Sequence, residues 1–335
     1  MTTYRDAGVD IDRANEFVAY IKEKVKRAFP DSPLTKFGGF ASGLPVEGHR
    51  EPVIFSSTDG VGTKLKVAQE LGVHDTVGID LVAMNVNDVI TTGADPLLFL
   101  DYIATGRIDL QVLKAVIDGV VEGCKRGEVL LAGGETAEMP GFYPEGVYDL
   151  AGFCVGVCER GEVITGEGVR SGDVLLGLRS SGFHSNGFSL IRKVLKDKGV
   201  KLTDRVEELG QSVGEVLLTP TRIYTPEVKL LKSNVELKAL AHITGGGIPE
   251  NLIRVLPEGI RAVVDKKSIP ENPVFAWIQK LGGVEEREMF RTFNMGVGMI
   301  AVVSPEDCDK ALDALGRDAF VCGHLEEGKR EVVIL

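Results

Sequence analysis

Residues 53–64 read VIFSSTDGVGTK, an apolar stretch that leads into a carboxylate, two glycines, a hydroxyl and a lysine. The apolar part predicts a strand, and the residues after Lys64 predict a helix that ends at Gly72. Such a turn offers backbone N–H groups to a phosphate, and its carboxylate, Asp59, can hold Mg²⁺. The spacing is not that of a P-loop, so a tight turn capped by Asp59 explains this stretch equally well.

Strands and helices also alternate on both sides of this stretch. Apolar residues at helical spacing predict helices over 12–29 and 110–124, and apolar runs predict strands over 149–158, 173–178, 237–243 and 295–303. A polar, glycine-rich segment at 161–172 separates two halves of ordinary domain size. The sequence therefore predicts a mixed α/β fold in two α/β domains, residues 1–168 and 169–335.

Composition excludes several classes of protein. The chain has 335 residues, 44% hydrophobic and 26% charged, and its net charge of −11 argues against binding to nucleic acid or to an anionic membrane surface. No apolar run approaches the roughly 18 residues of a membrane helix, and the acidic start does not resemble a secretory signal. Five cysteines without a C-x-x-C pair are typical of a reducing compartment. We expect a cytoplasmic protein with small anionic ligands.

Two further acidic segments lie in the first half. Asp80, Asn87 and Asp88 fall on or near one predicted helix, and oxygen ligands that converge in this way suit a hard cation with bound phosphate. Glu135 and Glu138 follow a predicted strand over 129–132 that Gly133 and Gly134 are expected to end. A solvated helix face or turn explains each residue alone, but Asn87 and Asp88 lie in a stretch too apolar to be mostly exposed.

The second half contains three comparable loops. Residues 180–187, SSGFHSNG, offer hydroxyls, an imidazole and backbone N–H groups ahead of a helix, although simple helix capping explains part of this pattern. Residues 241–251 place His242 before a hydroxyl, three glycines and a helix; a lone histidine is more often structural than catalytic. Residues 291–298 place Arg291 and Asn294 before a strand, where an edge-strand entry is an equal alternative.

Together these segments predict an enzyme that binds two phosphate-bearing ligands and Mg²⁺, such as a nucleotide and a phosphorylated substrate. The sequence resembles the phosphoribosylformylglycinamidine cyclo-ligase family along nearly its whole length. The matching segments are 4–12 (YRDAGVDID), 58–64, 78–96 with its D-x₄-G-A-x-P pattern, 133–141, 180–190, 241–251 and 291–299. The resemblance is weakest over 204–216 and 306–335.

The resemblance implies ATP-dependent closure of the imidazole ring of a formylglycinamidine ribonucleotide in purine biosynthesis. It also implies a homodimer whose N-terminal domains share a barrel-like sheet. By analogy, Asp59, Asp88 and Glu135 hold Mg²⁺. The residues implied to meet ATP are Lys36, Gly38, Gly39, Asp59, Gly60, Gly62, Thr63, Lys64, Asp80, Asn87 and Asn294. Those implied to meet the ribonucleotide are Ser185, Asn186, Thr244, Gly245 and Gly246, with His242 and Glu138 as candidate bases.

Two alternatives stay open on the sequence. One is another ATP-dependent enzyme of the same superfamily, such as a small-molecule kinase; a selenophosphate synthetase is disfavoured because no cysteine precedes Cys124. The other is a catalytically silent, nucleotide-binding regulatory protein. The second alternative predicts the loss of carboxylates from the phosphate loops, whereas Asp59, Asp88 and Glu135 are all present.

Overall fold

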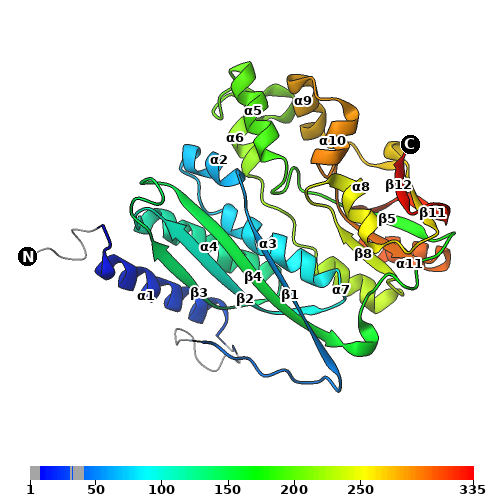
Figure 1. The fold of residues 1–335 in the computed structure, drawn as a ribbon, viewed down its shortest axis with the longest axis horizontal. Helices are drawn as coiled ribbons and strands as arrows, with labels where there is room; N and C mark the ends of the chain where they lie inside the picture. Colours follow the sequence, from blue (N-terminus) through cyan, green and yellow to red (C-terminus); the bar gives the residue numbers. More distant parts are fainter. Residues whose placement is uncertain (1–7, 31, 33–40) are drawn as a thin grey trace, which may run out of the picture. The chain divides into compact units, whose positions relative to one another are not determined.

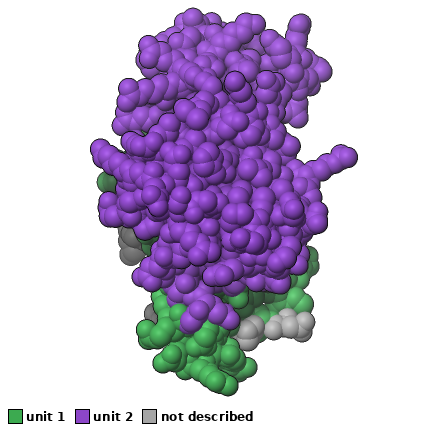
Figure 2. Space-filling view, turned by 90° about the vertical axis from the view of Figure 1, so that its right-hand side faces the viewer, with its two compact units in different colours: residues 1–89, 94–160 green, residues 90–93, 161–335 purple. Residues whose placement is uncertain are grey.

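A computed structural model describes residues 8–30, 32 and 41–335 of the chain (Figure 1). The chain divides into two compact units, coloured separately in Figure 2. Unit 1 consists of residues 1–89 and 94–160, and unit 2 consists of residues 90–93 and 161–335.

Unit 1 contains a four-stranded sheet in the order β1-β4-β2-β3. β4 pairs antiparallel with both β1 and β2, whereas β2 and β3 are parallel. The strands are β1 (Pro52–Gly60), β2 (Asp95–Thr105), β3 (Leu130–Glu138) and β4 (Tyr148–Glu159). Since β1, β2 and β3 all run in one direction, their carboxyl ends lie at the same edge of the sheet.

Helices cover one face of this sheet. Leu113, Val116, Ile117, Val120 and Cys124 are all buried on α4, which confirms the helix predicted from their spacing. Asp109 begins this helix by accepting hydrogen bonds from the backbone N–H groups of Gln111 and Val112. The helices of this part of the chain are α1 (Ile11–Ala28), α2 (Lys64–Leu71), α3 (Val77–Ile90) and α4 (Leu110–Arg126).

The opposite face of the same sheet is open and apolar. Ile54 on β1 is 64% exposed, Phe153 on β4 is 42% exposed and Leu100 on β2 is 36% exposed. Leu100 and Thr58 are both in register with Phe153, so these side chains share one face. Several exposed apolar side chains on one face of a sheet are typical of an interaction site.

One predicted strand end is wrong. We expected Gly133 and Gly134 to end the third strand, but β3 continues to Glu138. The reason is packing, because a Cβ atom on Gly134 would lie 2.3 Å from Oδ1 of Asp101 on the neighbouring strand. Glycine at this position lets the strand pass beside a buried carboxyl group instead of ending there.

Unit 2 contains a six-stranded sheet in the order β12-β9-β11-β5-β10-β8. All of its neighbouring strands are antiparallel except β12 and β9. The strands are β5 (Val174–Arg179), β8 (Ala239–His242), β9 (Ile260–Val264), β10 (Val297–Val303), β11 (Ala319–Glu327) and β12 (Glu331–Ile334). A separate two-stranded pair, β6 (Arg205–Val206) and β7 (Gln211–Ser212), lies in the stretch where the family resemblance is weakest.

The strands in the middle of the unit 2 sheet are buried. All seven residues of β10 are buried, so this strand is interior and not the edge strand that we considered from the sequence. Sequence analysis also missed the helix just before it, α10. The helices are α5 (Phe188–Lys198), α6 (Val213–Leu218), α7 (Thr225–Asn234), α8 (Gly247–Leu252), α9 (Pro273–Gly282), α10 (Glu286–Thr292) and α11 (Pro305–Leu315).

No helix within the described part of the chain has both the length and the apolar character needed to cross a membrane.

Candidate functional site

The turn between β1 and α2 presents Asp59 at the carboxyl end of the first strand. The Asp59 side chain is exposed, and its Oδ1 accepts a hydrogen bond of 2.7 Å from the N–H of Gly60. Gly62 has a φ of 72°, a backbone conformation that L side chains rarely adopt. Thr63 precedes α2 and is exposed, and its hydroxyl forms no capping hydrogen bond with that helix. This turn therefore presents a carboxylate and a hydroxyl to solvent.

Lys64 differs from its exposed neighbours in this turn. Its side chain is fully buried, and Nζ lies 2.9 Å from Oδ1 and 2.8 Å from Oδ2 of Asp80 on α3. Burial lowers the pKa of Lys64, and the Asp80 carboxylate opposes that shift. The structure thus places both predicted nucleotide residues in a buried ion pair that joins α2 to α3.

Asp88 and Asn87 lie on α3, beside the end of β1. Asp88 is half-buried and its Oδ2 accepts a hydrogen bond of 3.3 Å from the hydroxyl of Ser57, while Asn87 is fully buried. The sequence did not single out Asn85, which lies two positions before Asn87 on the same helix. Its Nδ2 donates to the backbone oxygens of Leu81 at 2.8 Å and Asp59 at 3.3 Å. Asn85 therefore attaches the turn after β1, which contains the metal candidate Asp59, to helix α3.

The strand pleat separates Glu135 from the other two metal candidates. Asp59, Gly152, Asp101 and Gly134 are in register across the sheet, and this row faces the helices. Glu135 belongs to the next row, with Tyr102, and its side chain is exposed on the open face. Three strand spacings, about 14 Å, also separate β1 from β3 along the sheet. Within the described residues, no three acidic, histidine or cysteine side chains form a metal-binding group.

Asp101 is a buried carboxyl group that sequence analysis did not select. It is 5% exposed and lies between Gly152 and Gly134 on the neighbouring strands. Burial raises its pKa to about 7, and the nearby charge of Glu135 adds to that shift. Gly134 was the available signal, because a Cβ atom there would lie 2.3 Å from Oδ1 of Asp101; a Cβ atom on Gly152 would instead meet Asn85 and Phe99.

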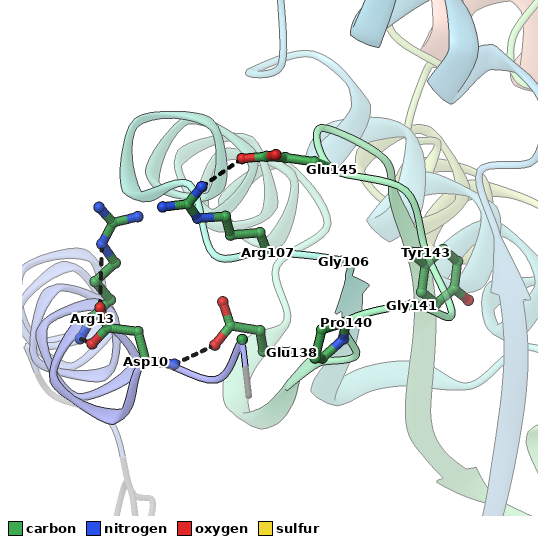
Figure 3. Close-up of a pocket in the computed structure, with 10 residues that line it drawn as sticks. Asp10, Arg13, Gly106, Arg107, Glu138, Pro140, Gly141, Tyr143 and Glu145 are labelled. Atoms are coloured by element: carbon green, nitrogen blue, oxygen red, sulfur yellow. Dashed lines mark hydrogen bonds and ion pairs between the residues drawn. The ribbon is translucent and has the colours of Figure 1, made fainter. Parts of the chain in front are cut away.

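Glu138 is held by backbone groups on two other segments, and Figure 3 shows its bond to Asp10. Its Oε2 accepts a hydrogen bond of 2.7 Å from the N–H of Asp10, and its Oε1 accepts one of 2.7 Å from the N–H of Ile108. Arg13 extends this connection, because its Nη1 donates to the backbone oxygen of Ile108 at 3.2 Å. Glu138 lines a cavity of about 350 Å³ with an exposed Arg107–Glu145 ion pair at 2.7 Å. Both oxygens of this candidate base are thus engaged with backbone donors.

In unit 2 the loop over 180–187 approaches the glycine-rich turn after β8. Ser185 Oγ lies 3.0 Å from Oγ1 of Thr221, and both residues are largely shielded from solvent. Asn186 Oδ1 would lie 3.5 Å from a Cβ atom on Gly245. The structure therefore brings together two of the segments that were predicted to meet the ribonucleotide.

The turn after β8 is shaped by Asn251, which is buried. Its Nδ2 donates to the backbone oxygens of Gly245 at 3.1 Å and Gly247 at 2.8 Å, and more weakly to that of Thr244 at 3.4 Å. A Cβ atom on Gly247 would lie 1.8 Å from the backbone oxygen of Phe290, so only glycine fits there. Gly246 has a φ of 92°, and His242, which ends β8, is 6% exposed.

Asn294 is also buried in unit 2, at 2% exposure, and its amide group contacts the backbone on two sides. Three predicted nucleotide residues, Lys36, Gly38 and Gly39, lie outside the described residues.

These features define a class of α/β enzyme. Each of its two units has a glycine-rich turn that is suited to a phosphate group. Comparisons with known proteins agree with that class. The N-terminal domain of AIR synthase related proteins matches residues 46–158, and the C-terminal domain of the same proteins matches residues 170–335.

Full-length relatives identify the family. The chain is 51% identical to the phosphoribosylformylglycinamidine cyclo-ligase of Thermoanaerobacter pseudethanolicus over 99% of each chain. It is 52% identical to the enzyme of the same name from Myxococcus xanthus, over 98% of this chain and 97% of the relative. The chain belongs to the phosphoribosylformylglycinamidine cyclo-ligase family, and it is therefore an enzyme, a ligase that forms a C–N bond.

Solved structures share the fold at much lower identity. Thiamine-monophosphate kinase from Stenotrophomonas maltophilia matches with a TM-score of 0.68 and 17% identity, over 94% of this chain and 95% of that one. The hydrogenase maturation protein HypE in complex with ATP matches with a TM-score of 0.67 and 18% identity, over 94% of this chain and 90% of that one.

Proposed function

We propose that the chain uses ATP to activate the formyl oxygen of formylglycinamidine ribonucleotide, and that the amidine nitrogen then closes the imidazole ring. The products are 5-aminoimidazole ribonucleotide, ADP and phosphate, as a step of purine biosynthesis. The observation that carries this proposal is about 50% identity to cyclo-ligases over nearly the full length of both chains. The glycine-rich turns of the two units supply phosphate-binding surfaces for the two ligands.

The chemistry requires positioning more than covalent catalysis. The formyl oxygen is a poor leaving group, and phosphorylation converts it into a good one. Phosphoryl transfer depends on alignment and on neutralisation of charge, which backbone N–H groups in glycine-rich turns provide. Ring closure then needs the amidine nitrogen held against the activated carbon. We assign ATP to the turn that contains Gly60, Gly62 and Thr63. The family resemblance implies that Lys36, Gly38 and Gly39 also meet the nucleotide.

Mg²⁺ fits the side chains at the end of β1. Mg²⁺ commonly uses one or two carboxylates and completes its shell with water and phosphate oxygens. Asp59, which is exposed, and Asp88, which is half-buried beside Ser57, supply such a pair on the helix-facing side. The bound ion would neutralise charge on the transferred phosphoryl group. Glu135 lies on the open face, so it would require a separate ion there.

Unit 2 would hold the ribonucleotide. We assign its phosphate to Ser185, Asn186, Thr244, Gly245 and Gly246, because these residues lie in two turns that approach each other at Asn186 and Gly245. His242 ends β8 directly before the second turn, and we propose that its imidazole accepts the proton released by the amidine nitrogen. Lys64, Asp80 and Asn87 are buried in unit 1 and would act there by supporting the β1–α2 turn against α3, whereas the buried Asn294 would act within unit 2.

The open face of the unit 1 sheet supports a homodimer. Ile54, Leu100 and Phe153 expose apolar side chains on that face, and a second copy would bury them. We further propose a cytoplasmic location, where the substrates of nucleotide synthesis are available.

The deciding experiment measures ADP release by the purified chain with Mg²⁺, with and without formylglycinamidine ribonucleotide. We expect ADP release that depends on the ribonucleotide and matches formation of the aminoimidazole product one to one. ATP turnover that does not depend on the ribonucleotide would contradict this function and favour a kinase of the superfamily. ATP binding without turnover would favour the regulatory alternative.

A further inference from the structure

Asn294 connects two backbone segments that are far apart in the sequence. Its Nδ2 donates a hydrogen bond of 2.8 Å to the backbone oxygen of Gly182, and its Oδ1 accepts one of 2.9 Å from the N–H of Gly296. The side chain is 2% exposed, so both bonds are shielded from water. The amide therefore uses one donor and one acceptor to hold the loop over 180–187 against the turn before β10.

Further contacts reinforce this junction. The N–H of Ser180 donates to the backbone oxygen of Gly296 at 2.9 Å. The rings of Phe183 and Phe293 lie 5.4 Å apart between centroids, in the same pair of segments. The turn is also strained at Met295, whose φ of 51° is unfavourable for a residue with a side chain, and Gly296 follows with a φ of 96° that glycine adopts readily. Such a conformation persists where neighbouring bonds impose it, and Asn294 supplies two of them.

The held loop carries the residues assigned to the ribonucleotide phosphate. Gly182 is three residues before Ser185 and four before Asn186, whose Oδ1 approaches the position of Gly245 in the second turn. The bond to the Gly182 carbonyl is therefore one of the contacts that hold this loop beside the second turn, together with the Ser181–Pro220 and Ser185–Thr221 hydrogen bonds. A shift of that carbonyl would move Ser185 and Asn186 relative to Thr244–Gly246 without any change in those residues.

We propose that Asn294 is a positioning residue that fixes the ribonucleotide-binding loop through Gly182, and that it makes no direct contact with the nucleotide. The proposal rests on the assignment of the ribonucleotide to unit 2 under the proposed function. It replaces the role in ATP binding that the family resemblance implies for this residue. Because ATP is assigned to unit 1, loss of the Asn294 bonds affects the KM of one substrate only.

The test compares Asn294→Asp with the matched control Asn234→Asp. In its ionised form, Asp at 294 cannot donate to the Gly182 carbonyl and places a buried acceptor against it. Asn234 is exposed and donates to the backbone oxygen of Leu230 within its own helix, so the same substitution there disturbs no loop. Gly182→Ala is the second variant: Gly182 has a φ of 146° and a Cβ atom there meets nothing within 4 Å, so the loop is displaced without crowding.

We expect Asn294→Asp and Gly182→Ala to raise the KM for formylglycinamidine ribonucleotide by about tenfold or more, the effect of losing a buried hydrogen bond. The KM for ATP stays within about twofold of wild type, and Asn234→Asp changes neither value. Amide hydrogen exchange over 181–186 should rise in both loop variants. A rise in the KM for ATP, or unchanged exchange over 181–186, would overturn the proposal.

The exchange measurement needs no turnover, so it separates the two proposals. In one outcome, wild-type turnover does not depend on the ribonucleotide, but exchange over the loop is faster in the variants. That outcome would overturn the substrate assignment and retain the role of Asn294 in holding the loop. Ribonucleotide-dependent turnover with unchanged loop exchange would retain the function and overturn the positioning role.

Discussion

The ammonium group of Lys64 and the carboxylate of Asp80 form an ion pair in which both side chains are fully buried. Nζ lies 2.9 Å from Oδ1 and 2.8 Å from Oδ2. The pair joins the first residue of α2 to the first turn of α3. It thereby fixes the β1–α2 turn, with Asp59, against the helix that carries Asp88. Breaking one side of such a pair costs far more than replacing both sides, because it leaves a buried charge without its partner.

Lys64→Met should therefore reduce the free energy of unfolding by about 3–5 kcal/mol, the usual cost of an orphaned buried charge. The double variant Lys64→Met with Asp80→Leu should recover most of that loss, because two apolar side chains can fill the same volume. Urea unfolding followed by circular dichroism measures both values. Equal losses in the single and double variants would show that the pair does not account for the destabilisation.

Asp88→Asn should abolish most turnover while the fold is retained. The amide keeps the shape of the carboxylate but removes a negative ligand, so the Mg²⁺ concentration for half-maximal activity should rise by roughly 10–100-fold. Ser57→Ala is the matched control, since it removes the 3.3 Å hydrogen bond to Asp88 and leaves the carboxylate in place. Full activity of Asp88→Asn at wild-type Mg²⁺ levels would exclude Asp88 from the metal site.

Sequence patterns were sufficient for most of the fold because the elements carry strong local signals. The apolar stripe of α4 and the apolar run of β10 allow few alternatives. The pattern failed at β3, where two glycines normally mark a turn but here make room for the Asp101 side chain on the next strand. Only the pairing partner explains those glycines, and a single sequence does not show which strands are neighbours.

In the candidate site, too, the sequence predicted the local features but not the contacts between distant segments. Spacing identified the turns that contain Asp59, Ser185 and Thr244, because glycine clusters and hydroxyls are local features. It did not reveal which charged groups are buried, so Lys64 was predicted to meet a ligand although Asp80 holds it inside the unit. It also did not show that the strand pleat turns Glu135 away from Asp59.

Asp101 should make stability depend on pH between about 4 and 7. Its folded pKa is about 7 against an ordinary 3.8, so the folded state keeps a proton that the unfolded chain releases. Stability therefore falls as pH rises through that window, at about 1.4 kcal/mol per pH unit as an upper limit for one group. Asp101→Asn removes this dependence, and its free energy of unfolding relative to wild type should increase with pH.

Denaturant unfolding of Asp101→Asn and wild type in EDTA, at pH 4.5 and at pH 7.5, gives that difference. Glu135→Gln should show a weaker version of the effect, because the charge of Glu135 adds to the raised pKa of Asp101. A constant difference between Asp101→Asn and wild type at both pH values would show that Asp101 ionises normally in the folded protein.

Glu138→Gln should weaken the attachment of α1 without changing the pH dependence of kcat. A glutamine side chain has one acceptor oxygen, so it cannot serve the N–H groups of both Asp10 and Ile108. Amide exchange at one or both of these residues should increase by about tenfold, as expected for one lost hydrogen bond. Glu145→Gln, an exposed change at the same cavity, is the control. Loss of the basic limb of the pH–rate profile in Glu138→Gln would instead identify Glu138 as the base.

Phe153→Asp should convert a dimer into monomers. Phe153 is 42% exposed on the open face beside Leu100, so a carboxylate there leaves the folded unit intact but cannot be buried against a second copy. Phe142→Asp is the matched control, because Phe142 is 71% exposed and lies in the loop between β3 and β4, outside the strands that form the open face. Sedimentation at micromolar concentration should give two chains for wild type and for Phe142→Asp, and one chain for Phe153→Asp. A wild-type monomer, or a Phe153→Asp dimer, would exclude the open face as the interface, and the exposed apolar side chains would then need a different partner.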